Sequence, residues 1–260
     1  MSHVIVTTAG RPDEVTEQRA LAAAQALGYK QITRHKRSVQ QLMDVYGCDV
    51  LVAGKQRYEF YRKAVDGPFF FHPDTAAFRL KRLMNGQNDP LVDACDLKLG
   101  DSFLDTTLGL ATDSLVAAHA VGPAGRVTGI EIDPNIAFIT KLGLTEFEPK
   151  FLELQEAMRR INVIQESATS YLIQSADDTY DVVYMDPMFS QPIAESSSFA
   201  PLRQVGVHGS LTQEWVNEAI RVAKRRVVVK AHYLDSVFDE FGFRRIRRPN
   251  TKFHFGIIEK

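Results

Sequence analysis

One segment constrains the fold of this 260-residue chain more than any other: residues 102–113, which read Ser-Phe-Leu-Asp-Thr-Thr-Leu-Gly-Leu-Ala-Thr-Asp. Its first three residues are typical of a short buried strand, and Asp105 stands where that strand ends. A tight turn around Gly109 follows, and then Thr112 or Asp113 can cap a helix. A strand, a carboxylate, a glycine-containing turn and a helix N-terminus together predict a nucleotide-type pocket at the carboxyl edge of a parallel sheet.

The carboxylate of Asp105 makes this pocket unlike a phosphate-binding loop. A P-loop needs a Lys-Ser or Lys-Thr pair after its glycines, and the segment has none. A phosphate beside Asp105 would be repelled, whereas a cationic amino-acid moiety would be attracted. The segment therefore favours S-adenosyl-L-methionine, which carries an ammonium and a sulfonium, over NAD or ATP. A purely structural strand–turn–helix junction is the alternative.

Composition limits the class of protein only broadly. No apolar run approaches the roughly 20 residues of a membrane span, so we expect no membrane partner. The N-terminus lacks a signal-peptide pattern, and we expect a cytoplasmic protein. Cys48 and Cys95 have no metal-type spacing, and we expect buried free thiols and no metal.

The formal net charge of −1 hides an uneven distribution of charge. Residues 131–186 carry eleven acidic and four basic side chains, a net charge of −7, whereas residues 221–260 carry eleven basic and four acidic ones, a net charge of +7. Residues 53–85 add a net charge of +4. An acidic centre between basic surfaces suits a cationic cofactor and a polyanionic partner such as RNA, with ordinary solvated faces as the alternative.

The first third of the chain alternates strand and helix patterns. We expect strands at residues 4–8, 32–35, 49–53 and 57–61, and helices at residues 14–27 and 39–46. These elements predict a small N-terminal α/β domain, residues 1–98, with a candidate role in substrate recognition. A helix over residues 75–84, capped by Asp74, presents Arg79 and Arg82 on a basic face, and we predict that both bind the substrate.

From residue 99 to residue 260 the alternation repeats on a larger scale. We expect further strands at residues 126–132, 161–164, 180–185 and 225–230, one helix over residues 146–160, and a hairpin at residues 243–247 and 253–258. Repeated strand–helix units closed by a hairpin predict an α/β fold with a doubly wound, mostly parallel, Rossmann-like sheet. Residues 190–209, rich in Ser, Pro and Gly, are expected to form a mobile loop over a site.

Residues at the strand ends predict where the cofactor lies. Glu131 ends the second strand, 22 residues beyond Gly109, where a ribose diol is usually held. Ser167 and Ala168 follow the third strand, where an adenine ring would pass. The predicted cofactor-binding residues are Asp105, Thr106, Thr107, Gly109, Asp113, Glu131, Ile132, Ser167, Ala168 and Asp186.

The fourth strand ends in Asp186-Pro187-Met188-Phe189, and the resemblance to methyltransferases set out in the next paragraph implies that the methyl acceptor binds there; a strand-end turn with Phe189 in the core is the alternative. An exocyclic base amine is a weak nucleophile because its lone pair is spread into the ring. Asp186 is suited to accept one of its N–H groups and the carbonyl of Pro187 the other, while Phe189 is suited to stack on the base. We predict these three as catalytic residues and Met188 and Lys230 as substrate contacts, with a sheet-edge cation as the alternative for Lys230.

With these pieces in order, residues 99–260 resemble the class I S-adenosylmethionine-dependent methyltransferases. The segments that are similar to the RsmJ-like family of bacterial small-subunit rRNA guanine-N2 methyltransferases are residues 105–113, 185–189 and 224–230, with residues 75–79 ahead of them. This resemblance implies methyl transfer from S-adenosyl-L-methionine to guanine N2 of rRNA, with S-adenosyl-L-homocysteine as the product. The chain departs from the family in two places: its turn carries one glycine rather than three, and Ser167 replaces an acidic residue found in many relatives.

Two other functions stay open at this point. Methylation of a small-molecule or protein amine would use the same strand ends. A non-catalytic RNA-binding protein would keep the fold with a degenerate cofactor loop, to which the single glycine points. A dehydrogenase is disfavoured because Gly-x-Gly-x-x-Gly is absent after the relevant strand. The sequence indicates neither the oligomeric state nor the target nucleotide.

Overall fold

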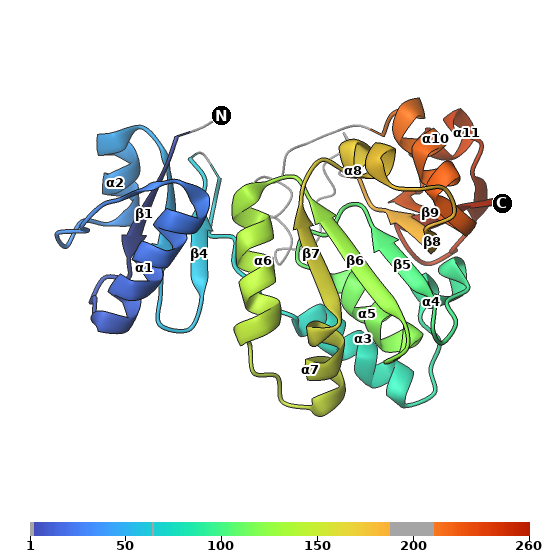
Figure 1. Ribbon diagram of the computed structural model, residues 1–260, viewed down its shortest axis with the longest axis horizontal. Helices are drawn as coiled ribbons and strands as arrows, with labels where there is room; N and C mark the ends of the chain where they lie inside the picture. The colour runs from blue at the N-terminus through green and yellow to red at the C-terminus, as the bar shows by residue number, and fades with distance from the viewer. Residues whose placement is uncertain (1–2, 64, 188–210) are drawn as a thin grey trace.

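The computed structural model describes residues 3–63, 65–187 and 211–260, which form two β-sheets (Figure 1). A smaller unit of four strands comes first in the chain, and a larger unit of seven strands follows. The two units lie side by side, with helix α6 (Pro134–Glu146) of the larger unit next to strand β4 (Tyr58–Tyr61) of the smaller one. Within the described ranges, no helix combines the length and the apolar character needed to cross a lipid bilayer.

The smaller sheet has the order β2-β1-β3-β4. Its first three strands are β1 (Val4–Thr8), β2 (Lys30–Gln31) and β3 (Asp49–Ala53), and every pair is parallel except β3 with β4. Helix α1 (Glu14–Leu27) packs on the face of β1 that carries Val4 and Val6, and helix α2 (Val39–Tyr46) packs on the face that carries Ile5. Strand β1 is therefore buried on both faces, which explains its continuous β-branched sequence.

The strand that we predicted at residues 32–35 is wrong. The observed strand β2 covers Lys30–Gln31, and Ile32 adds only one backbone hydrogen bond, from its N–H to the carbonyl of Val6 (2.8 Å). His35 and Lys36 adopt positive φ values of 47° and 61°, so the chain turns away from the sheet there.

The larger sheet has the order β10-β11-β9-β8-β5-β6-β7. Its strands are β5 (Ser102–Asp105), β6 (Arg126–Glu131), β7 (Ile161–Gln165), β8 (Tyr180–Met185), β9 (Ala223–His232), β10 (Arg244–Ile246) and β11 (Phe253–Glu259). Strands β5 to β9 are parallel, and β11 is antiparallel to both β9 and β10. The chain runs outward from β5 to β7 and then places β8 beside β5, so the strand order reverses between these two strands. This topology confirms the predicted doubly wound, Rossmann-like sheet with a terminal hairpin.

Helices cover both faces of the larger sheet (Figure 1). The helices of one face are α3 (Asp74–Met84), α4 (Pro90–Cys95), α5 (Thr112–Val121), α6 and α7 (Leu152–Arg159). Those of the other face are α8 (Ala168–Gln174), α10 (Gln213–Val222) and α11 (Val237–Glu240). Each set shares one apolar core with the strands beneath it.

The continuous helix that we predicted over residues 146–160 is also wrong. Helix α6 ends at Glu146, and helix α7 begins at Leu152. Pro149 lies between them, and proline lacks a backbone N–H and disfavours helical geometry in the residue before it. Leu154 and Met158 of α7 both pack into the core.

Helices α3 and α4 precede the predicted domain boundary at residue 98, yet they pack with the larger sheet. Both contact α5, and α4 also contacts β9 and β11. Helix α4 was not predicted; Asp89 caps it by accepting the N–H of Leu91 (2.9 Å), and Pro90 occupies its first turn. The division at residue 98, and the role of the first unit in substrate recognition, stay predictions; this packing favours a boundary nearer residue 73.

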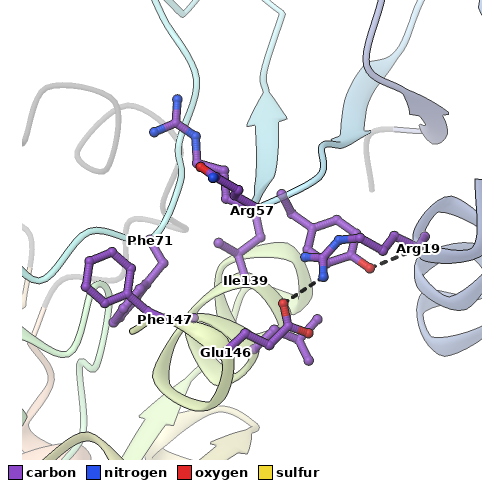
Figure 2. Close-up of a pocket in the computed structure, with 10 residues that line it drawn as sticks. Arg19, Arg57, Phe71, Ile139, Glu146 and Phe147 are labelled. Atoms are coloured by element: carbon purple, nitrogen blue, oxygen red, sulfur yellow. Dashed lines mark hydrogen bonds and ion pairs between the residues drawn. The ribbon is translucent and has the colours of Figure 1, made fainter. Parts of the chain in front are cut away.

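A shallow pocket marks the interface between the two units (Figure 2). Arg19 of α1 forms an ion pair there with Glu146 of α6 (2.8 Å), and Phe71 lies against the same helix. The contact is close because residue 143 is a glycine: a β-carbon added to Gly143 would lie 2.1 Å from Cγ of Phe71. The bare backbone of α6 is therefore the surface on which the Phe71 ring packs.

Gly143→Ala is expected to lower the free energy of unfolding by about 1–2 kcal/mol. Alanine favours the helix by about 1 kcal/mol, but overpacking costs about 1–3 kcal/mol. The new atom would overlap Cβ and Cγ of Phe71, which cannot move aside as the tip of a flexible side chain can. The cost of this overlap therefore outweighs the gain in helix propensity, and the free energy of unfolding falls. Urea unfolding measures the difference, with Gly10→Ala as the control because its added β-carbon would meet nothing within 4 Å. A Gly143→Ala protein more stable than wild type would contradict this packing.

Candidate active site

Four charged side chains stand at the carboxyl ends of four neighbouring strands. In the order of the sheet they are Lys230 on β9, Asp186 after β8, Asp105 at the end of β5 and Glu131 at the end of β6. Asp105 and Asp186 lie on adjoining strand tips, at the point where the strand order reverses. Open α/β sheets bind their ligands at such a point.

The β5–α5 turn, residues 106–111, is fastened by its own side chains and by strand β8. Asp105 accepts the N–H of Thr107 (2.9 Å) with one carboxylate oxygen and the hydroxyl of Ser114 (2.7 Å) with the other. The N–H of Thr106 donates to the carbonyl of Tyr184 (3.0 Å). Burial raises the pKa of Asp105 to about 6, against the hydrogen bonds from Ser114 and Thr107. Asp105 thus organises the turn from inside the protein.

The helix after this turn starts differently from the prediction. Ala111 is the N-cap, with a left-handed φ of 59° and no capping side chain, so Thr112 and Asp113 are the first helical residues. The predicted cap is therefore wrong, and the reason is that Asp113 uses its carboxylate elsewhere. A second predicted cap, Asp74, also lies inside its helix, after Pro73.

Asp113 is the centre of a partly buried network of charges. One carboxylate oxygen accepts from Arg79 (2.5 Å), and the other accepts from the hydroxyl of Tyr184 (2.8 Å) and from Nζ of Lys230 (3.0 Å). Arg79 also forms a two-pronged ion pair with Asp89 (2.7 and 2.8 Å). Burial alone would raise the pKa of Asp113, but the charges of Lys230 and Arg79 outweigh it and hold that pKa well below its usual range.

The two predicted substrate-binding arginines of α3 point in different directions. Arg79 lies on the packed side of the helix with Ala76 and Leu80, and 19% of its side chain is exposed. Arg82 is exposed and donates to the side-chain oxygen of Gln87 (2.8 Å). The basic face of this helix is thus formed by Lys81 and Arg82, whereas the charge of Arg79 is paired with Asp89 and Asp113. Contacts of either arginine with a substrate stay predictions.

Asp186 is fixed from two sides. Its N–H donates to the hydroxyl oxygen of Thr107 in the β5–α5 turn (2.8 Å), and its carboxylate accepts from Nζ of Lys230 (2.6 Å). Burial would lower the pKa of Lys230, but Asp113 and Asp186 raise it, so the ammonium stays charged. Lys230 is therefore a cation in an ion pair at the sheet edge. Pro187 is buried directly after Asp186.

Three predictions fall outside the described residues. They are the substrate contact Met188, the catalytic residue Phe189 and the loop at residues 190–209. The roles of these two side chains and of the loop therefore stay predictions from the sequence.

Glu131 closes the β5–α5 turn from the side of β6. Its carboxylate accepts the N–H of Gly109 (3.1 Å) and the N–H of Asp133 (2.9 Å). Burial raises the pKa of Glu131 to about 7, against these two hydrogen bonds. Asp133 caps α6 by accepting the N–H of Asn135 (2.8 Å).

One residue of this site was missed by the sequence analysis. Gly129 lies within β6, and a β-carbon there would sit 2.3 Å from Cδ1 of Leu108. Leu108 belongs to the β5–α5 turn and donates its N–H to the carbonyl of Ile130 (2.9 Å). The turn therefore packs directly on the bare backbone of β6. A glycine inside a strand pattern commonly marks such a close approach, so the signal was present in the sequence.

Comparisons with known proteins decide the family. The model of the SAM-dependent methyltransferase family SAM_MT, where SAM is S-adenosylmethionine, matches residues 55–242. The chain belongs to the SAM-dependent methyltransferases. The methyltransferase is 40% identical over 255 residues to protein YpiP of Bacillus subtilis (strain 168), and the match covers 98% of this chain and 99% of YpiP.

Two further relatives agree with this membership. The methyltransferase is 28% identical over 188 residues to ribosomal RNA small subunit methyltransferase J of Nitrosococcus oceani, which is 69% of this chain and 72% of that enzyme. The crystal structure of the SAM-dependent methyltransferase NGO1261 from Neisseria gonorrhoeae superposes with a TM-score of 0.64 at 18% identity, over 98% of this chain and 95% of that one. This structural superposition shows that the two proteins share a fold. Together they confirm the predicted RsmJ-like, class I methyltransferase.

The strand ends of this methyltransferase fit its cofactor in chemistry and in order along the sheet. Ser167 and Ala168 open helix α8 next to the end of β6. Ile132 is 43% exposed and offers an apolar surface for an adenine ring, and Glu131 beside it offers a carboxylate for a ribose diol. The turn that follows Asp105 lies next along the sheet, where the amino-acid end of the cofactor would sit. These individual contacts stay predictions.

Gly129→Ala is expected to weaken binding of S-adenosyl-L-homocysteine about tenfold, because displacing Leu108 moves the β5–α5 turn. Isothermal titration calorimetry measures the affinity. Leu108→Ala in the Gly129→Ala background removes the overlapping atoms and is expected to recover part of the loss. Unchanged affinity in Gly129→Ala would show that the turn does not depend on this contact.

Affinity for S-adenosyl-L-homocysteine is also expected to rise with pH up to about 7, the pKa of Glu131, and to level off above it. Below that pH the free protein holds a proton on Glu131, and hydrogen bonds from a ribose diol favour the ionised carboxylate, so binding releases the proton. Calorimetry in buffers of different ionisation enthalpy counts the released protons. Glu131→Gln should bind with a flatter pH dependence, and a flat wild-type profile would contradict the ribose role.

Proposed function

We propose that this methyltransferase methylates an exocyclic base amine of RNA, guanine N2 of small-subunit rRNA. The observation that carries the proposal is Asp186 beside the cofactor turn: its carboxylate accepts from Lys230 (2.6 Å), and its backbone N–H donates to the hydroxyl oxygen of Thr107 (2.8 Å). The name of the Nitrosococcus oceani relative supports rRNA as the class of substrate.

The chain's own residues would act by holding and polarising the amine. S-adenosyl-L-methionine supplies a methyl group on sulfur, and its thioether leaving group is neutral, so orientation carries much of the rate. Asp186 would accept one N–H of the amine, and the carbonyl of Pro187 would accept the other. These acceptors favour a pyramidal nitrogen, and they stabilise the positive charge that develops on nitrogen more than they stabilise the ground state.

Lys230 is a positioning residue in this scheme. Its ammonium lies between the carboxylates of Asp186 (2.6 Å) and Asp113 (3.0 Å), and Asp113 is itself held by Arg79 and Tyr184. The direction of the Asp186 carboxylate is thereby tied to buried groups. The ammonium of Lys230 would therefore orient the carboxylate of Asp186 without contacting the base.

Asp186→Ala is expected to lower the rate of methyl transfer about 100-fold or more at saturating S-adenosyl-L-methionine, because the amine loses its carboxylate acceptor. The assay follows tritium from labelled cofactor into total RNA of a strain that lacks the protein, and nucleoside mass spectrometry identifies the product as N2-methylguanosine. Asp239→Ala, which removes an exposed carboxylate on α11, is the matched control.

The same assay separates the competing functions. Retained turnover in Asp186→Ala would remove its proposed role. Label that enters protein or small amines but no RNA would replace the proposed substrate class. Absence of any transfer by a wild-type protein that binds RNA would favour the non-catalytic alternative.

A further inference from the structure

The hairpin formed by β10 and β11 carries a dense positive charge next to the proposed acceptor site. Residues 244–252 contain five Lys or Arg and no Asp or Glu. We call the hairpin surface the set of Tyr233, Arg245, Arg247, Arg248 and Lys252. Arg247 and Lys252 are exposed, and Tyr233, directly after β9, is 42% exposed.

Hydrogen bonds hold the residues of this surface in place. The N–H of Tyr233 donates to the carbonyl of Lys252 (2.9 Å), which continues the pairing of β9 with β11. Arg245 donates to Nδ1 of His254 (2.8 Å) and also to the carbonyl of Tyr233. Burial and then the charge of Arg245 lower the pKa of His254, which agrees with a neutral ring that accepts this hydrogen bond.

The ring of Tyr233 has fixed aromatic neighbours on its inner side. Its centroid lies 4.6 Å from the ring of His232 and 6.1 Å from the ring of His254. His232 is buried, and so is His254, so the rings behind Tyr233 belong to the packed interior. Tyr233 is thus supported from within by these rings while the residue as a whole stays exposed.

A short chain of contacts leads from this surface to the acceptor site. His232 pairs in register with Phe253, and their rings lie 6.4 Å apart. Nζ of Lys230 lies 5.7 Å from the centroid of the Phe253 ring and 2.6 Å from the carboxylate of Asp186. The hairpin surface therefore adjoins the strand tip that would hold the reacting base.

We propose that the hairpin surface binds the single-stranded RNA that flanks the methylated nucleotide, with one base stacked on Tyr233 and the phosphates next to it held by Arg247 and Lys252. This inference rests on the proposed function. Single-stranded nucleic acid is bound where an exposed aromatic ring, which is tolerant of base identity, lies within a positively charged track. An acidic protein segment would match the charge but would leave the exposed ring without a planar partner.

Binding of a fluorescein-labelled single-stranded RNA of mixed sequence, followed by fluorescence anisotropy at several salt concentrations, tests the proposal. Tyr233→Ala is expected to bind about tenfold more weakly, and Tyr233→Phe, which keeps the stacking face, to bind like wild type. The double variant Arg247→Gln/Lys252→Gln is expected to reduce the slope of log affinity against log salt by about 1.4, because each lost phosphate contact removes about 0.7.

Matched controls come from the opposite end of the larger sheet. Lys141→Gln/Lys150→Gln removes two exposed charges on and after helix α6, which packs near β7, and it should leave the salt slope unchanged. All variants should bind S-adenosyl-L-homocysteine with wild-type affinity, which shows that they are folded.

The outcomes separate this inference from the proposed function. If Tyr233→Ala and the double hairpin variant bind and methylate RNA as well as wild type does, the RNA-binding role of the hairpin surface is wrong and the proposed function stands. RNA binding that depends on the hairpin without any methyl transfer to RNA would support the surface and overturn the proposed function. Equal loss of binding in the hairpin and control variants would overturn the inference as well, since a diffuse charge effect would explain it.

Discussion

The site depends on one partly buried carboxylate that compensates two partly buried cations. Asp113 accepts hydrogen bonds from Arg79 of α3, Tyr184 of β8 and Lys230 of β9, and it lies in the first turn of α5. Loss of one partner would leave the remaining charge without compensation, at a cost below the roughly 3–5 kcal/mol of a fully buried pair, because solvent still reaches these side chains, which are 12%, 19% and 23% exposed. Four elements from distant parts of the chain are thereby locked to one another at the carboxyl edge of the sheet. The orientation of Asp186 follows from this lock, since Lys230 belongs to both ion pairs.

The strand ends were predictable from sequence, whereas the partners of their side chains were not. Asp105, Glu131 and Asp186 each follow a β-rich run, and parallel strands bring such ends to one edge whatever the intervening chain does. The ion pairs of Asp113 join residues 34 and 117 positions away, and no local period encodes a contact at that distance. The break between α6 and α7 and the close approach at Gly129 were different cases. Both had local signals, a proline and a mid-strand glycine, which the helical and strand patterns around them outweighed.

The charge at the active edge is more balanced than the sequence indicates. Counted along the chain, residues 131–186 carry a net charge of −7, which we interpreted as an acidic centre between basic surfaces. In the folded protein, Lys230 and Arg79 enter from outside this segment and pair with Asp186, Asp113 and Asp89. The other two carboxylates at this edge, Asp105 and Glu131, have pKa values raised by burial, so a fraction of each is protonated near neutral pH. The negative charge at the active edge is therefore smaller than the count of acidic residues along the chain indicates.

Strand β11 occupies an interior position although it is made late. It lies between β9 and β10, and it pairs with β9 along seven residues, Phe253–Glu259. Until the ribosome has released these residues, β9 must present an open row of peptide groups, the kind of template that recruits strands from other chains. The larger sheet consequently stays incomplete until residues 253–259 have been translated. Chains that stop before residue 253 are thus expected to be captured by chaperones or to aggregate, even though they contain nearly the whole cofactor edge.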